Sequence, residues 1–263
     1  IEVQQKGALW LRLEAGGAGG HSASADASGP AARIARAVAR LAAMEGPVRV
    51  EPVLERQLRA LALVRPAPEA AFLRQLATEV ARDPEGVRRR VAPWQRLLLS
   101  DTVSVTRFGT DSPAVNAHPR TAWAEVDARL LPSTSPDDFL AAVVEAIADP
   151  KVTVRVLLSA KGEPESPETG LFSIARRVLR RRFPGAVVAP VLGPGLSENR
   201  VLRGRGIRAY GMLPFRVNYY DAVGIHGRNE RMRADWFVEG VETVVQLVRE
   251  AATGQGPAES PRR

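Results

Sequence analysis

The side chains best suited to chemistry in this 263-residue chain are its three histidines, because the chain contains no cysteine. His21 follows a glycine-rich turn, His118 precedes a proline, and His226 stands before a glycine. Loops held by rigid elements often carry binding or catalytic groups, so each position is compatible with a functional role. An isolated histidine is nevertheless more often a surface or structural residue. No two of the three have the spacing of metal ligands on one helix, so the histidines alone define no metal site.

The composition is that of an ordinary globular protein, and it narrows the functional classes. The absence of cysteine excludes a disulfide framework, a thiolate metal site and a cysteine nucleophile. The net charge is +8, but only three of the 37 basic residues are lysine, and aromatic residues make up 5%. Because single-stranded nucleic acids are bound largely by base stacking on aromatic rings, we expect no nucleic-acid partner. No apolar run reaches the ~18 residues of a membrane span, and we slightly favour the cytoplasm as the compartment.

The order of strands and helices in the first part of the chain predicts an α+β domain. Alternation is clearest where Leu9, Leu11 and Leu13 face one way and polar side chains the other, which indicates a half-buried strand. Similar patterns predict strands at 8–14, 101–108, 121–131 and 152–158 and helices at 30–45 and 137–148. Prolines break residues 52–98 into an insert of short helices. The resulting order, β-α-(helical insert)-β-β-α-β, favours a ferredoxin-like sandwich over residues 7–160.

A polar linker at 161–167 separates this domain from a second pattern, in which helices and strands alternate. We expect helices at 169–183 and 197–203, strands at 186–192 and 207–212, and a final helix that carries Phe237, Val241, Val244 and Val248. Alternation of this kind is typical of α/β domains, but two strands are too few to close a parallel sheet. We therefore interpret residues 161–252 as part of a larger domain and residues 253–263 as a disordered tail.

Short sequence blocks spread over nearly the whole chain carry more information than any single residue. They are Lys6-Gly7, Gly19-Gly20-His21-Ser22, Val53-Leu54-Glu55-Arg56-Gln57-Leu58, Asn116-Ala117-His118-Pro119, Glu125-Val126-Asp127-Ala128-Arg129, Phe183-Pro184, Gly195, Arg200 and Ile225-His226-Gly227-Arg228-Asn229-Glu230-Arg231. In this order and spacing they resemble the zinc-dependent carboxypeptidase and aminoacylase metallopeptidases. The helical insert is similar to that of the carboxypeptidase S and N-acyl-amino-acid hydrolase branch.

The resemblance implies an α+β ferredoxin-like lid, or dimerisation, domain at 7–160. It is followed at 161–252 by the C-terminal part of an α/β zinc-peptidase catalytic domain. The family's N-terminal catalytic part carries a His-x-Asp ligand pair and two adjacent glutamates, and neither pattern occurs in this sequence. We therefore expect a fragment that is inactive by itself. A homodimer can form through the lid, unless the insert covers the edge of the lid sheet.

The reaction implied by the resemblance is hydrolysis of a peptide or N-acyl amide bond next to a free carboxylate, with two zinc ions activating water. His226 is then a metal ligand, the only one of the centre in this chain, and His21 is catalytic and contacts the tetrahedral oxyanion. In dimeric relatives that histidine comes from the other subunit. Asn116 and Arg129 hold the substrate carboxylate, which a planar guanidinium fits well. The implied substrate is a small peptide or an N-acyl amino acid.

Other interpretations of these residues stay open at the level of the sequence. Arg129 is compatible with a solvated strand position, and Asn116 with a turn residue that caps its own backbone. Ser197-Glu198-Asn199 stands where the family usually has Thr-Asp-Ser, and the longer acid shifts its charge by about one methylene group. His118 replaces a typically apolar residue. The alternative function is therefore a non-catalytic homologue that acts as a binding or dimerisation scaffold, and a weaker one is an arginine-driven nucleic-acid binder.

Overall fold

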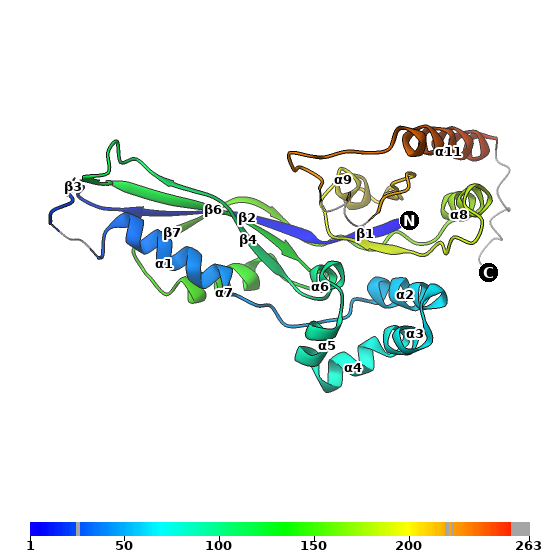
Figure 1. Cartoon of the computed structure of the whole chain (residues 1–263), viewed down its shortest axis with the longest axis horizontal. Coiled ribbons are helices and arrows are strands. Elements are labelled where there is room, and N and C mark those ends of the chain that lie inside the picture. The colour runs from blue at the N-terminus through cyan, green and yellow to red at the C-terminus, as the bar shows by residue number, and fades with distance from the viewer. Residues whose placement is uncertain (25–26, 219–220, 222–223, 254–263) are drawn as a thin grey trace.

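The computed structural model describes residues 1–24, 27–218, 221 and 224–253, so the expected tail lies outside the described part beyond its first residue, Thr253. The molecule is elongated (Figure 1). A sheet and two helices lie toward one end, and helices α8 (Gly170–Arg182) and α11 (Ala234–Ala252) lie at the other. None of the described helices combines the length and the apolar character required to cross a bilayer.

Four antiparallel strands form the lid sheet in the spatial order β4-β6-β2-β7. The strands are β2 (Gly7–Gly16), β4 (Thr102–Thr110), β6 (Thr121–Leu130) and β7 (Val152–Ala160). Helices α1 (Pro30–Ala42) and α7 (Pro136–Ile147) cover one face of this sheet (Figure 1). This arrangement is the ferredoxin-like order that the sequence predicts, so the predicted fold class of the lid is confirmed.

The core of the lid forms because alternate side chains of its strands point toward the two helices. Leu9, Leu11 and Leu13 are at most 1% exposed and pack in one cluster with residues of α1 and α7. Each side chain of this size contributes roughly 2 kcal/mol when it is fully buried. The other face of the sheet carries charged pairs, such as Arg12 with Glu125 at 2.9 Å. The sheet is therefore apolar on its helix side and carries charged side chains together with Trp10 and Trp123 on its open side.

The segment between α1 and β4 forms the predicted insert of short helices. These are α2 (Pro52–Leu61), η1 (Ala62–Val64), α3 (Ala67–Arg74), α4 (Leu76–Arg82), α5 (Pro84–Arg90) and α6 (Pro93–Leu99). Four of them have a proline in the first turn, where the missing N–H costs no hydrogen bond. Their buried side chains share a core with Val3, Phe172 and Leu192. Among the described residues this core includes none from the lid strands, so the insert packs on the C-terminal part.

The C-terminal part is built around a small parallel sheet. β1 (Glu2–Gln5) pairs with β8 (Val191–Gly193), and α8, α9 (Asn199–Gly204) and α11 belong to the same part. The three helices expected here are confirmed to within a few residues. β1 is not among the predicted strands, because four residues are too few to show a period. The strand predicted at 186–192 is limited to β8, because β1 offers it only a short partner.

The strand predicted at 207–212 is wrong. Within it only Gly211 forms a β-bridge, with N–H···O distances of 2.7 and 3.0 Å to Glu2. Just before it, the carbonyl oxygen of Ala209 accepts a hydrogen bond from Nε of Arg203 at 2.9 Å. A side chain thus takes the hydrogen-bonding position that a neighbouring strand would occupy, and the apolar segment stays irregular.

The chain passes four times between the lid and the rest of the molecule. These passages are residues 5–7, 43–51, 99–102 and 160–163. The second and third passages are joined directly, since the N–H of Arg49 donates to the carbonyl oxygen of Leu99 at 2.7 Å. A Cβ on Gly7 would lie 2.5 Å from the carbonyl oxygen of Ala160. Replacing Gly7 would therefore displace a second passage of the chain.

Lys6 is buried at the centre of this junction, with 1% of its surface exposed. Its Nζ donates to the carbonyl oxygens of Leu97 and Ser100, both at 2.8 Å. These acceptors lie at the C-terminal end of α6, where the helix dipole favours a cation. Burial lowers the pKa of Lys6 to about 8, and the nearby Asp101 carboxylate opposes that shift. The lysine thus joins the start of the lid to the insert.

We expect the free energy of unfolding to rise with pH between about 8 and 10.5 because of Lys6. In this window the unfolded chain binds more protons than the folded chain, since the lysine pKa returns to its ordinary value on unfolding. The total rise is of order 3 kcal/mol and is absent in Lys6→Met. Urea unfolding at a series of pH values measures it. Lys161→Met, at an exposed lysine, is the control and keeps the rise; the same rise in Lys6→Met would contradict the assignment.

Candidate functional site

A small second ladder builds the tip of the lid. β3 (Gly20–His21) pairs antiparallel with β5 (Ala117–His118). Both strands are two residues long, so neither shows in the sequence pattern. Gly19, just before β3, has φ +71°, and a Cβ there would lie 3.0 Å from the Arg120 side chain. The turn that leads into β3 therefore requires glycine.

Asp111 closes the loop that carries β5. Its Oδ1 accepts the N–H groups of Arg120 and Thr121, both at 2.9 Å. The hydrogen bond from the backbone of Thr121 is the main cause that lowers the pKa of Asp111. The loop between β4 and β6 is thereby fixed at its base, and the segment with Asn116 and His118 projects from it.

His21, the predicted catalytic residue, is exposed at the end of β3. Its Nδ1 accepts the N–H of Ala23 at 3.1 Å, which requires that Nδ1 carries no proton. In the neutral imidazole the proton is then on Nε2, which is available as a donor. A donor of this kind is what stabilisation of an oxyanion requires.

Asn116, a predicted substrate-binding residue, lies beside His21 at the tip. The N–H of Ser22 donates to the carbonyl oxygen of Asn116 at 3.0 Å, which extends the β3–β5 pairing by one step. Asn116 is exposed, and its backbone oxygen is used in this contact. The structure therefore brings together two of the predicted site residues that are far apart in the sequence.

Arg129, the other predicted substrate-binding residue, lies toward the far end of β6. It follows Thr121 at the tip by eight residues, about 27 Å along an extended strand. Its Nε and Nη2 donate to the two carboxylate oxygens of Asp127, each at 2.7 Å. One protomer thus does not place Arg129 and Asn116 on the same carboxylate. The guanidinium is also already occupied by a neighbouring acid.

His226, the predicted metal ligand, is exposed in the loop that precedes α11. Its backbone is left-handed, with φ +65°, and its N–H donates to Oε2 of Glu230 at 2.9 Å. The loop therefore turns sharply at this residue and is braced from within. Among the described residues, no three histidine, aspartate or glutamate side chains gather at a spacing suited to a metal ion. His226 alone does not fit a metal centre, and it can supply one ligand at most.

An aromatic pair joins the segment before this loop to α11. Phe215 and Phe237 stack with their ring centroids 5.7 Å apart. Gly240 lies against the first of these rings, and a Cβ on it would be 2.1 Å from the Phe215 ring. The sequence pattern does not predict this contact, although a glycine inside a strongly amphipathic helix is a signal of close packing. The segment with Phe215, which leads into the His226 loop, thus packs against α11 at a residue without a side chain.

The segment Ser197-Glu198-Asn199 follows β8 at its carboxyl end, where α/β sheets commonly bind ligands. Nε2 of Gln5 donates to Oγ of Ser197 at 2.9 Å, and the N–H of Ser197 donates to Oε1 of Gln5 at 3.3 Å. Nearby, Arg203 and Glu163 form a buried ion pair at 2.9 Å, and burial raises the pKa of Glu163. The serine hydroxyl therefore helps to hold the segment after β8 against β1.

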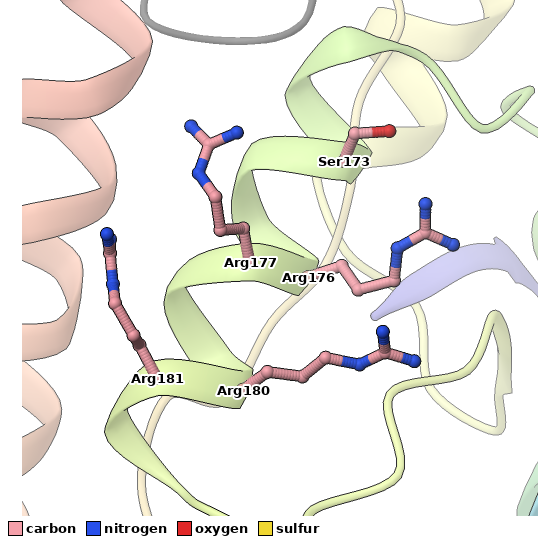
Figure 2. A pocket seen from close by; sticks show the side chains of 5 residues that line it. All are labelled: Ser173, Arg176, Arg177, Arg180 and Arg181. Atoms are coloured by element: carbon pink, nitrogen blue, oxygen red, sulfur yellow. The ribbon is translucent and has the colours of Figure 1, made fainter.

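Four arginines of α8, together with one serine, line a hollow of about 490 Å³. Figure 2 shows Arg176 and Arg180 projecting to one side of the helix, and Arg177 and Arg181 to the side of α11. Arg177 pairs with Glu250 of α11 at 3.0 Å, and Arg181 contacts the same carboxylate. Part of the positive charge of this helix is therefore used in helix packing.

This chain has recognisable relatives among known proteins. The sequence profile described as the peptidase dimerisation domain matches residues 3–154. Among curated proteins, the chain is 26% identical to the N-fatty-acyl-amino acid synthase/hydrolase PM20D1 of Mus musculus, over 98% of this chain and 52% of that protein. It is 24% identical to the Homo sapiens protein of the same name, with the same coverage. The chain thus spans about half the length of the curated relatives it matches.

Solved structures share the fold of the chain at low sequence identity. Human carnosine dipeptidase 1 aligns with a TM-score of 0.68 and 14% identity, covering 96% of this chain and 56% of that one. The di-peptidase Dug1p from Saccharomyces cerevisiae gives 0.64 and 14%, covering 99% and 56%. The metallo-carboxypeptidase Sso-CP2 from Sulfolobus solfataricus, of the M20 family, gives 0.60 and 16%, covering 94% and 59%.

We expect Gly240→Ala to displace the loop that carries His226. The added methyl group overlaps the Phe215 ring, which must leave its stack on Phe237. Overpacking of this kind costs about 1–3 kcal/mol, partly offset by the higher helix propensity of alanine. Urea unfolding measures the loss, and the NMR signals of the His226 ring report the displacement. Gly204→Ala, at a helical glycine with open space around it, is the control. Unchanged His226 signals in Gly240→Ala would contradict the assignment.

Proposed function

This chain belongs to the M20 family of metallopeptidases and aminoacylases, and on that premise we propose that it forms the lid and C-terminal part of a metal-dependent amide hydrolase. The observation that supports this most directly is the β3–β5 ladder, which sets His21 and Asn116 side by side at an exposed tip. The bond cleaved is a peptide or N-acyl amide bond next to a free carboxylate. The names of the N-fatty-acyl-amino acid synthase/hydrolases support an N-acyl amino acid as substrate.

In this proposal, Nε2–H of His21 donates to the oxyanion that forms when water adds to the scissile carbonyl. The N–H of Ala23 on Nδ1 supports this role, because it keeps the proton on Nε2 before substrate binds. A donor that is already oriented needs no reorganisation during the reaction, and one such donor lowers the barrier by about 3 kcal/mol.

We propose that His21 acts on the active site of a second protomer. β3 and α11 lie at opposite ends of one chain (Figure 1), so its own lid tip is well separated from the helix that follows the His226 loop. The lid sheet ends in the edge strands β4 and β7, and either edge can pair with a second copy. A homodimer through the lid would then supply the histidine to its partner.

The substrate carboxylate is proposed to be bound by Asn116 and Arg129. Because about 27 Å of strand separates Arg129 from the lid tip, the two reach one carboxylate only when they come from different chains. The substrate also has to replace Asp127 on the guanidinium of Arg129. This exchange keeps the bidentate geometry that arginine forms with carboxylates, so its cost is small.

The two zinc ions of the proposal depend mainly on residues outside this chain. The described residues provide His226 as a single candidate ligand, which does not make a metal centre. We therefore assign this chain one ligand and no step of the water activation. Its own residues bind the carboxylate and donate a hydrogen bond to the oxyanion.

The alternative function is a non-catalytic scaffold that uses the same lid for association. One observation favours it, because the Ser197 hydroxyl, in the segment that departs from the family pattern, is engaged by Gln5. A hydroxyl that is hydrogen-bonded to a residue of β1 is less available to a substrate. The two functions predict opposite results in a direct assay.

We expect hydrolysis by a longer protein in which this chain is joined to the part, about half of its relatives' length, that the chain does not match. N-acyl amino acids and dipeptides serve as substrates, and release of the free amine is measured. Activity is expected to stop with a chelator and to return with Zn²⁺. His21→Ala should lower kcat by about 10²–10³-fold. Arg180→Gln on α8 is the control and keeps full activity. No hydrolysis of either substrate class by the metal-loaded protein would favour the scaffold.

We expect two impaired variants of that protein to complement each other. His21→Ala and His226→Ala are each strongly impaired as homodimers, because each lacks one of the two groups that a shared site needs. Dimers re-formed from a mixture should regain part of the activity, since one site of each mixed dimer is intact. If the unsubstituted protein is active but mixing the two variants restores no activity, His21 would be assigned to the site of its own chain.

A further inference from the structure

His118 links β5 to the turn that follows His21. Its Nε2 lies 2.8 Å from the carbonyl oxygen of Ser24. A carbonyl oxygen only accepts hydrogen bonds, so Nε2 of His118 must carry the proton and donate. The ring is only partly buried, and it spans from one strand of the ladder to the far end of the turn.

The turn from His21 to Ser24 is also closed on the His21 side. Both the N–H and the Oγ–H of Ser24 donate to the carbonyl oxygen of His21, at 3.2 and 2.8 Å. Ala23 lies between these two residues, and its N–H is the group that binds Nδ1 of His21 at 3.1 Å. Fixing Ser24 therefore fixes the direction of the Ala23 N–H.

We propose that His118 is a positioning residue for His21. By holding Ser24, His118 keeps the Ala23 N–H on Nδ1 and so keeps the proton of His21 on Nε2. This inference rests on the proposed function, in which that Nε2–H contacts the oxyanion. His118 does not itself contact the oxyanion, because its Nε2–H already donates a hydrogen bond to the carbonyl oxygen of Ser24. The tip is exposed, so water competes for these hydrogen bonds. The bond from His118 to Ser24 therefore reduces the number of tautomers and orientations that the His21 ring adopts.

Long-range ¹H–¹⁵N NMR of the 263-residue chain, with labelled histidine, tests the proposal. The spectrum contains three imidazoles, and single substitutions assign them. The measurement is made at a pH where the rings are neutral, so that it reports which nitrogen of His21 carries the proton. Exchange of the Ala23 amide with solvent is measured in parallel. The variants are His118→Leu, which removes the donor, and His118→Gln, whose amide keeps a donor at similar reach.

In the parent chain we expect a single His21 tautomer with the proton on Nε2. In His118→Leu we expect a mixture of both tautomers and exchange of the Ala23 amide that is about three- to tenfold faster. His118→Gln should restore both readouts. His226→Gln, which removes an imidazole outside the lid, is the matched control and leaves His21 unchanged.

Unchanged His21 tautomer and Ala23 exchange in His118→Leu would overturn the proposal, even if the melting temperature fell. Loss of the whole β3–β5 ladder in that variant would also overturn it, because His118 would then be a structural residue of the tip. The result is independent of turnover. A complete protein that fails to hydrolyse any substrate would remove the proposed function while leaving the NMR result in place.

Discussion

The lid meets the remainder of the molecule at a tightly packed junction around Lys6 and Gly7. Two passages of the chain approach so closely there that Gly7 has no space for a Cβ. The ammonium group of Lys6 is held by two carbonyl oxygens at the end of α6 instead of by water. A buried cation without such acceptors would cost several kcal/mol, so the insert and the start of β2 are fixed together. The separation between the lid tip and the C-terminal part follows from this joint.

The lid can be predicted from the sequence because its strands are long and half-buried. The alternation of Leu9, Leu11 and Leu13 belongs to a strand of ten residues, and prolines mark several helix starts. The sheet of the C-terminal part cannot be predicted in the same way, because it pairs Glu2 with Val191, which lies far away in the sequence. β1 has four residues, and a buried Gln5 hides its pattern. Such pairing is decided by tertiary packing rather than by local preference.

In the candidate site, the sequence identifies residue types better than it identifies neighbours. It marks His21 and Asn116 separately, but the ladder that joins them consists of strands too short to show a period. The ion pair between Arg129 and Asp127 could have been expected, since side chains two positions apart on a strand share a face. The segment that leads into the His226 loop contacts α11 through the stacked rings of Phe215, from a loop, and Phe237, from the helix. No local pattern contains that contact.

The four neighbouring passages through the junction also have a mechanical consequence. A domain tethered by one segment pivots freely, whereas several adjacent backbone segments, cross-linked by Lys6 and by Arg49, resist both bending and torsion. Hinge motion needs a few residues that can absorb large backbone changes, and here they are packed against other passages. In the proposed homodimer, a large swing of the lid would therefore require one subunit to rotate against the other.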